Sequence, residues 1–139
     1  MCLQSWRMTR SRHISVSIAA TACRVYAFAA DPAQLPAWAA GLAQSSMERV
    51  GDQWFAQSPM GRVRVDFTGS NELGVLDHTV ILPGGEQVLN PMRVIPDGTS
   101  CEVVFTVRQR PGMSEQQFDD DCNAVAADLD TLRALMERP

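Results

Sequence analysis

The chain has 139 residues, of which 45% are hydrophobic, which is enough for one globular domain with a buried core. Its formal net charge of −4 argues against a nucleic-acid partner, because phosphate binding needs a concentrated basic face. All 12 basic residues are arginines, and without lysine no lysine Schiff base can form.

The N-terminus lacks the features of a targeting or membrane segment. Residues 1–12 carry three arginines, and no stretch approaches the ~18 consecutive apolar residues of a membrane span. We therefore expect residues 1–11 to be a flexible tail, no stable membrane insertion and a cytoplasmic location. The cysteines fit no zinc or CxxC spacing, and those inside predicted elements are expected to be small buried hydrophobes in a reducing compartment. The four are Cys2, Cys23, Cys101 and Cys122.

One strand and two short helices are predicted first. Apolar and polar residues alternate over His13–Ala20, as in a half-buried strand. Thr21 is placed to cap a helix over residues 22–30. Asp31 is placed to cap a second helix, Ala33–Leu42, with a proline at its first position.

Turn residues then divide the middle of the chain into strands. Five Gly-, Pro-, Asn- or Asp-containing turns follow one another, and Asp97-Gly98 is the strongest hairpin signal among them. Short turns between consecutive strands predict an antiparallel meander. The predicted strands are Ser46–Val50, Gln53–Gln57, Arg62–Ser70, Val75–Leu82, Glu86–Ile95 and Ser100–Arg108.

A long amphipathic helix closes the chain. Ser114 and Gln117 form a capping box, and the helix is expected to reach Arg138. Its apolar residues recur at alternating spacings of four and three, as on one buried face. These residues are Phe118, Cys122, Val125, Leu129, Leu132 and Met136. The opposite face, which we expect to be solvated, carries Asp119, Asp120, Asp128, Asp130 and Arg133.

These elements assemble into a single α+β domain over residues 12–138. We expect a seven-stranded curved antiparallel sheet wrapped around the long C-terminal helix, with two short helices after the first strand. This order of elements is that of the helix-grip fold.

The local sequence resembles the START-like, helix-grip (SRPBCC) superfamily, which includes polyketide cyclase/dehydrases and lipid-transfer domains. The resemblance lies first in Val25–Pro32 and in Leu35-Pro36-Ala37-Trp38. Further similar segments, of a small uncharacterised bacterial subgroup, are Gly74–His78, Asn90–Pro96, Glu102–Thr106 and Arg110–Ser114. The resemblance implies a hydrophobic cavity between sheet and C-terminal helix, and it implies no shared catalytic set.

His78 is the best candidate for a catalytic group. Alternation places it on the inward face with Val80 and Leu82, where a desolvated imidazole is suited to act as a general base. The alternative is a core histidine hydrogen-bonded to a backbone carbonyl or a carboxylate. The opposite strand register would instead send His78 to solvent and Asp77 inward.

Two further polar positions have a functional and a structural interpretation. Asn90 is suited to hydrogen-bond a ligand, but beside Pro91 it also fits a bulge or a strand edge. Asp66 and Asp77 lie on adjacent predicted strands, as paired acid–base carboxylates would. The alternative for Asp66 is a solvated ladder of charges with Arg62 and Arg64, which share its face.

Large apolar side chains are predicted to point at the interior. They either line a ligand pocket or fill the core completely. These are Trp38, Trp54, Phe67, Met92, Phe105 and Phe118, with Met60 near the entrance. Together with His78 and Asn90 they form the predicted ligand site.

The sequence favours binding of a small hydrophobic or amphipathic ligand in an internal cavity. One alternative is a polyketide cyclase/dehydratase-like enzyme that uses His78 to move a proton. Another is a co-chaperone-like or toxin-like interaction module with a solid core and an exposed apolar patch. We expect no metal site and no cofactor, and a homodimer is possible.

Overall fold

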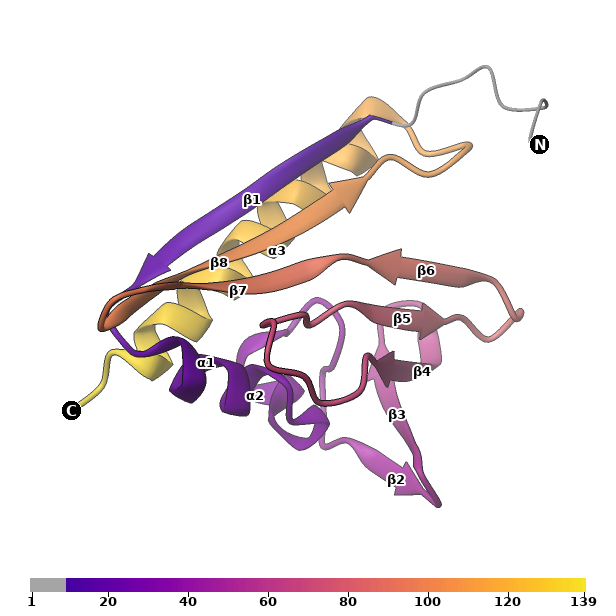
Figure 1. The fold of residues 1–139 in the computed structure, drawn as a ribbon. Coiled ribbons are helices and arrows are strands. Elements are labelled where there is room, and N and C mark those ends of the chain that lie inside the picture. The colour runs from indigo at the N-terminus through magenta and orange to yellow at the C-terminus, as the bar shows by residue number, and fades with distance from the viewer. Residues whose placement is uncertain (1–9) are drawn as a thin grey trace, which may run out of the picture.

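The computed structural model describes residues 10–139, which form a curved antiparallel sheet and a long helix lying against it (Figure 1). Strand β1 (Ser11–Ile18) pairs with β8 (Ser100–Arg108), and helix α3 (Glu115–Met136) contacts both strands. The expected α+β helix-grip architecture is confirmed. The predicted tail lies mostly outside the described residues, and Ser11 already belongs to β1.

The two helical segments after β1 begin at the predicted caps. The Thr21 hydroxyl accepts the backbone N–H of Arg24 at the start of α1 (Ala22–Ala29). The second helix is shorter than the predicted Ala33–Leu42: a 3-10 turn, η1 (Pro32–Gln34), leads into α2 (Leu35–Trp38). It ends because Ala39 leaves the helical region, with φ −109° and ψ 60°.

Residues 10–139 contain eight strands where the sequence predicted seven. The further strands are β2 (Glu48–Val50), β3 (Gln53–Ser58), β4 (Gly61–Phe67), β5 (His78–Ile81), β6 (Gln87–Asn90) and β7 (Met92–Asp97). Together with β1 and β8, these strands form two hydrogen-bonded ladders, with the strand orders β1-β8-β7 and β2-β3-β4-β5-β6 (Figure 1). The additional strand arises because the predicted strand Glu86–Ile95 is divided into β6 and β7.

Pro91 is the point of division. Proline has no backbone N–H, so the ladder cannot continue through it. Before it, Asn90 pairs with His78 on β5; after it, Met92 pairs with Phe105 on β8. The chain therefore changes its pairing partner at a single residue, which makes β6 and β7 two strands.

The two ladders meet at a seam, which is formed by residues 74–76, just before β5, and residues 92–94 of β7. Residues 74–76 run beside β7, where Val94 N–H donates to the Gly74 carbonyl at 2.9 Å and Leu76 N–H donates to the Met92 carbonyl at 2.8 Å. A bridge between Val75 and Arg93 lies between these bonds. The sheet is thus continuous in hydrogen bonding although its strands fall into two groups.

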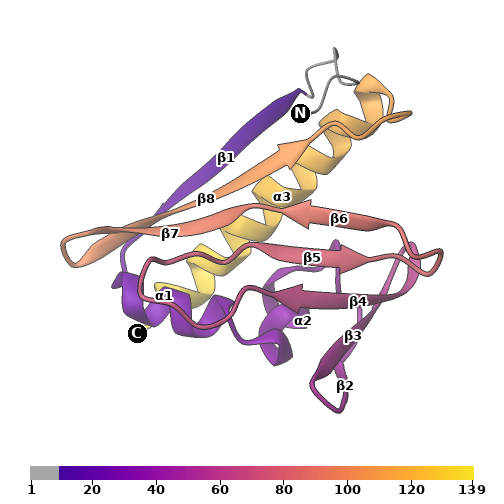
Figure 2. The same ribbon diagram turned by 45° about the vertical axis from the view of Figure 1, so that its right-hand side comes forward.

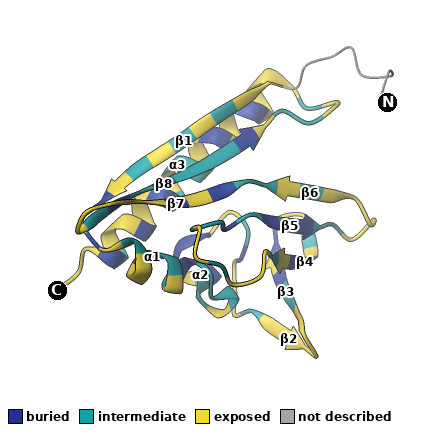
Figure 3. Ribbon diagram, viewed as in Figure 1, coloured by how far each residue is buried: buried dark blue, intermediate teal, exposed yellow. Residues whose placement is uncertain are grey.

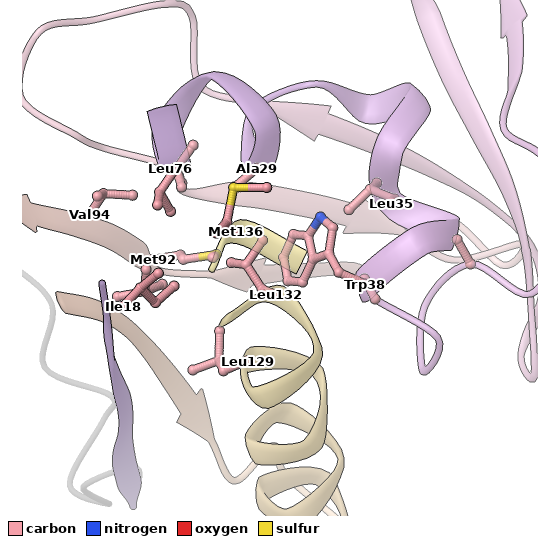
Figure 4. Packing of buried hydrophobic residues seen from close by; sticks show 14 of the residues in the cluster. Ile18, Ala29, Leu35, Trp38, Leu76, Met92, Val94, Leu129, Leu132 and Met136 are labelled. Atoms are coloured by element: carbon pink, nitrogen blue, oxygen red, sulfur yellow. The ribbon is translucent and has the colours of Figure 1, made fainter. Parts of the chain in front are cut away.

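The core lies between the sheet and the buried face of α3 (Figure 3). Leu129, Leu132 and Met136 of α3 pack with Trp38 and Met92 (Figure 4). The predicted apolar stripe is confirmed, with five of its residues buried and Val125 half-buried. The capping box of Ser114 and Gln117 is also formed.

A smaller apolar cluster joins β1 and the first turns of α3. Phe118 is fully buried there, and the guanidinium groups of Arg10 and Arg12 cover its ring at 5.3 and 4.7 Å from the centroid. Arg10 also pairs with Glu115, and Arg12 pairs with Asp119 at 2.7 Å. These two arginines connect the start of the first strand to the last helix, because each contacts the Phe118 ring and also pairs with a carboxylate of α3.

The cysteines follow the prediction in part. Cys101 and Cys122 are free and buried, as expected of small hydrophobes. Cys23 is free but exposed, because α1 buries Val25 and Ala29, and residue 23 lies on its other side. Cys2 lies outside the described residues.

Candidate functional site

A cavity of about 410 Å³ is lined by residues of α2, α3, β5 and β6, with the end of β8 beside them. Figure 2 shows how these helices and strands are arranged around one another. This volume is within the usual range for small-molecule sites. The apolar lining includes Leu35, Trp38, Ala39, Leu42, Met60, Val80, Leu82, Val88, Leu89, Phe105, Val107, Ala124, Val125 and Leu129. The polar lining includes His78, Gln87, Asn90, Arg108, Gln109, Arg110, Asp121 and Asp128. The site is therefore amphipathic.

Five of the nine predicted ligand-site residues line this cavity. They come from four elements and one turn and are Trp38, Met60, His78, Asn90 and Phe105. Met60, in the turn between β3 and β4, is 48% exposed, which places it where the cavity opens to solvent. The structure thus brings together the expected entrance residue, the expected histidine and two of the expected aromatic groups.

The other four predicted residues lie elsewhere. Phe67 packs against the ring of His78, with centroids 4.9 Å apart, but does not itself line the cavity. Met92 is buried in the main core, and Phe118 belongs to the smaller cluster. Trp54 is half-buried near the start of β3, with the Arg49 guanidinium 5.7 Å from its ring.

His78 is 4% exposed, lines the cavity and is held in one orientation. Its Nδ1 lies 3.0 Å from the carbonyl oxygen of Leu76, and the rings of Phe67 and Phe105 lie against it at centroid distances of 4.9 and 5.7 Å. Burial lowers the pKa of His78, while the Leu76 carbonyl and the charge of Asp77 raise it to a lesser extent. The imidazole thus lies at the cavity, as the inward register predicts, and it bonds a backbone carbonyl, as the core-histidine interpretation predicts; its role as a general base stays a prediction.

The two strand carboxylates have separate structural roles. Asp66 is exposed and accepts two hydrogen bonds from Arg64, at 2.8 and 3.1 Å, as the solvated-ladder interpretation predicts. Asp77 instead accepts the backbone N–H of Met92 at 2.9 Å. It thereby supplies an acceptor at the seam, where Pro91 interrupts the ladder.

Asp128 was predicted on the solvated face of α3, and that expectation was wrong. It is half-buried and lines the cavity beside Gly41. Desolvation raises its pKa from 3.8 to about 6, although the backbone N–H groups of Ala40 and Gly41 favour the charged form. Asp121, seven residues earlier, also lines the cavity; burial raises its pKa, and Arg110 opposes that shift.

Sequence reasoning also missed the connection from β8 to α3. Arg108, Gln109 and Arg110 contribute polar and cationic groups to the lining. A signal was present on α3, because residues 121 and 128 lie four residues before and three residues after Val125 of the apolar stripe, and such spacings place side chains on the same side of a helix. It was overlooked because carboxylates were assigned to solvent.

Trp38 carries a buried donor in the wall of the site. The side chain is 3% exposed, and its indole Nε1 is buried without a hydrogen-bond partner (Figure 4). An unpaired buried N–H is rare and destabilising. The apolar wall of the cavity therefore includes one polar atom whose hydrogen bond is unmade.

Residues 10–139 contain no group of three or more His, Cys, Asp or Glu side chains arranged to hold a metal ion. Over the same residues, no helix has the length and apolar character needed to cross a bilayer.

The sequence model of one family, polyketide cyclase / dehydrase and lipid transport, matches residues 7–137. The chain belongs to this family. No curated protein sequence matches the chain. Family membership agrees with the START-like resemblance found in the sequence.

Solved structures show the same fold at low sequence identity. An uncharacterised protein from Bacillus thuringiensis matches with a TM-score of 0.72 at 11% identity, over 93% of this chain and 100% of that one. Norcoclaurine synthase from Thalictrum flavum matches with a TM-score of 0.66 at 18% identity, over 99% and 100%. CalU16 from Micromonospora echinospora matches with a TM-score of 0.67 at 17% identity, over 93% and 75%. At these identities the similarity establishes the fold alone.

Proposed function

We propose that the protein binds a small amphipathic molecule in the cavity between the sheet and α3. The observation that carries this proposal is the amphipathic lining of a 410 Å³ space, with an oriented, buried His78 in its wall. Apolar burial would supply most of the affinity, at about 25 cal/mol per Å². The small number of polar groups would set the orientation of the ligand. The expected cytoplasmic location and a homodimer stay predictions.

The enzyme alternative rests on the family description and on the position of His78 in the cavity. Acid–base chemistry of this kind usually pairs the histidine with a second titratable group that orients the imidazole or restores its protonation state. Among the described residues, no titratable side chain lies within hydrogen-bond distance of His78, whose one hydrogen bond is to the Leu76 carbonyl. This isolation favours binding over turnover.

The interaction-module alternative requires a solid core and a contiguous exposed apolar patch. The structure has a cavity instead, and two of the exposed large hydrophobic residues, Met60 and Leu89, are part of its lining. Apolar exposure at these positions is accounted for by the opening of a ligand site. This alternative is therefore not favoured.

A matched pair of tryptophan substitutions on α3 tests the proposal. Ala124 and Ala127 are both exposed on the same helix, but only Ala124 lines the cavity. Ala124→Trp should obstruct the site, whereas Ala127→Trp should not. Native mass spectrometry and titration with an environment-sensitive apolar fluorophore would measure bound ligand in both variants and in the unaltered protein.

The expected result is binding by the unaltered protein and by Ala127→Trp, with a loss of about tenfold or more in Ala124→Trp. Circular dichroism of both variants would establish that the fold is retained. Equal binding by the two variants would place the ligand elsewhere. Failure of the unaltered protein both to retain a molecule and to take up a panel of apolar probes would overturn the proposal.

A further inference from the structure

The orientation of His78 determines what a ligand must offer it. A carbonyl oxygen can only accept, so the 3.0 Å contact with Leu76 places the hydrogen on Nδ1. Nε2 of the neutral ring is then unprotonated, and it makes no hydrogen bond to any described residue. Burial lowers the pKa of His78, which keeps the ring neutral. His78 is therefore a fixed hydrogen-bond acceptor in the cavity wall.

Asp128 is the second acceptor, and it lacks a cation. None of the ion pairs among the described residues involves Asp128. The lining arginines are Arg108 and Arg110; Arg110 lies 3.9 Å from Glu86 and also acts on Asp121. Asp121 is two helical turns, or about 10 Å, from Asp128. Only the backbone N–H groups of Ala40 and Gly41 favour the charge of Asp128.

A half-buried carboxylate without a counterion is costly, because desolvation penalises its charge with little compensation. A cationic ligand group would remove that cost, and a second anion or a carbonyl would increase it. The same selection applies at Nε2 of His78, which repels another acceptor. Two independently positioned groups of one cavity thus require hydrogen-bond donors.

We infer that the ligand is a small apolar amine, whose protonated nitrogen lies against the carboxylate of Asp128 and which presents an N–H or O–H to Nε2 of His78. This inference rests on the proposed function, and it names the chemical class that the same cavity selects. A poly-ketone is a poor match, because its carbonyl oxygens only accept. A neutral alcohol would satisfy His78 but would leave Asp128 without a cation.

The inference can be tested with four naphthalene probes that differ only in the head group. The heads are 2-aminoethyl, 2-hydroxyethyl, acetyl and carboxymethyl, and calorimetric titration at pH 7.5 would give each affinity. We expect the ammonium probe to bind about tenfold more tightly than the alcohol, because a hydrogen bond between two charged groups is stronger than one to a neutral donor. The ketone and the carboxylate should bind more weakly than the alcohol.

Two variants of α3 assign the preference to a residue. Asp128→Asn keeps the shape and removes the charge, so it should reduce the affinity for the ammonium probe about tenfold and leave the alcohol unchanged. Asp130→Asn is the control, because Asp130 is exposed, pairs with Arg133 at 3.6 Å and does not line the cavity. It should leave all four affinities unchanged.

The outcomes separate this inference from the proposed function. If the probes bind without preference for the ammonium head, or if Asp128→Asn binds the ammonium probe as tightly as the unaltered protein, the inference is wrong and the cavity function stands. If no probe binds, and the fluorophore titration above also fails, the proposed function itself is overturned.

Discussion

Gly74→Ala tests whether the seam beside β7 holds the two ladders together. Gly74 has φ +72°, and a Cβ there would lie 2.2 Å from the Val94 carbonyl oxygen, a contact that backbone atoms cannot relieve without moving apart. A left-handed conformation costs a non-glycine residue about 1–2 kcal/mol. Separation would also weaken the bonds from Val94 N–H to Gly74 and from Leu76 N–H to Met92, at about 1 kcal/mol each. We expect a loss of about 3 kcal/mol or more.

Gly98→Ala supplies the matched control. Gly98 has φ +62° in the β7–β8 hairpin, but nothing lies within 4 Å of the position its Cβ would take. This variant should lose only the conformational cost of about 1–2 kcal/mol. Urea denaturation followed by tryptophan fluorescence would compare the free energies of unfolding at constant m value. Equal losses in the two variants would show that the seam contributes nothing beyond backbone conformation.

Three further changes have defined expectations. Asp77→Ala should lower the free energy of unfolding by about 1–3 kcal/mol, because it leaves the Met92 N–H without its acceptor. Asp66→Ala is the control, since it removes only an exposed ion pair and should cost less than about 1 kcal/mol. Urea unfolding would compare the two variants, and equal losses would show that the bond from Met92 to Asp77 contributes nothing beyond a surface interaction. The folded-state pKa of Asp128 is raised to about 6, so its contribution to stability is present below about pH 4 and is lost as pH rises through 6. Asp128→Asn should accordingly be more stable than the unaltered protein at pH 7.5, by about 1 kcal/mol after allowing for solvent screening. This difference should disappear at pH 4. Thermal melts at both pH values would measure it, and a difference that is the same at both would contradict this reasoning. Ser114→Ala should lower stability by about 1 kcal/mol through loss of the cap, and an unchanged melting temperature would mean that the first turn of α3 is held by packing alone.

Local signals in the sequence were sufficient for most of the fold. The caps at Thr21 and Ser114 interact with nearby backbone atoms, and hairpin turns such as Asp97-Gly98 act within a few residues. Such signals do not depend on the rest of the molecule. The element order and the buried stripe of α3 were therefore predictable, and together with the family resemblance they indicated the helix-grip fold.

Non-local effects account for what the sequence did not reveal. Pro91 marked a possible bulge, but the change of partner from β5 to β8 depends on pairing between distant segments. Asp128 was assigned to solvent because it is a carboxylate, but it is half-buried in the folded chain, where the backbone of Ala40 and Gly41 lies against it. Phe118 was predicted to line the pocket, but Arg10 and Arg12 enclose it in a separate cluster.

The pairing of β1 with β8 has a consequence for how the chain reaches its native state. Ser11 lies opposite Arg108, and Ile18 lies opposite Cys101, so the first strand pairs with the last strand of the chain. The entropy of closing so long a loop is lost before most of the strand-pairing energy is gained. Folding therefore slows as the mean sequence separation of contacts rises. During synthesis β1 leaves the ribosome well before β8, and at about 5–20 residues per second its edge is unpaired for several seconds. The polar residues that alternate along β1, among them Ser15 and Ser17, lower the hydrophobicity of the unpaired strand and thereby its tendency to aggregate.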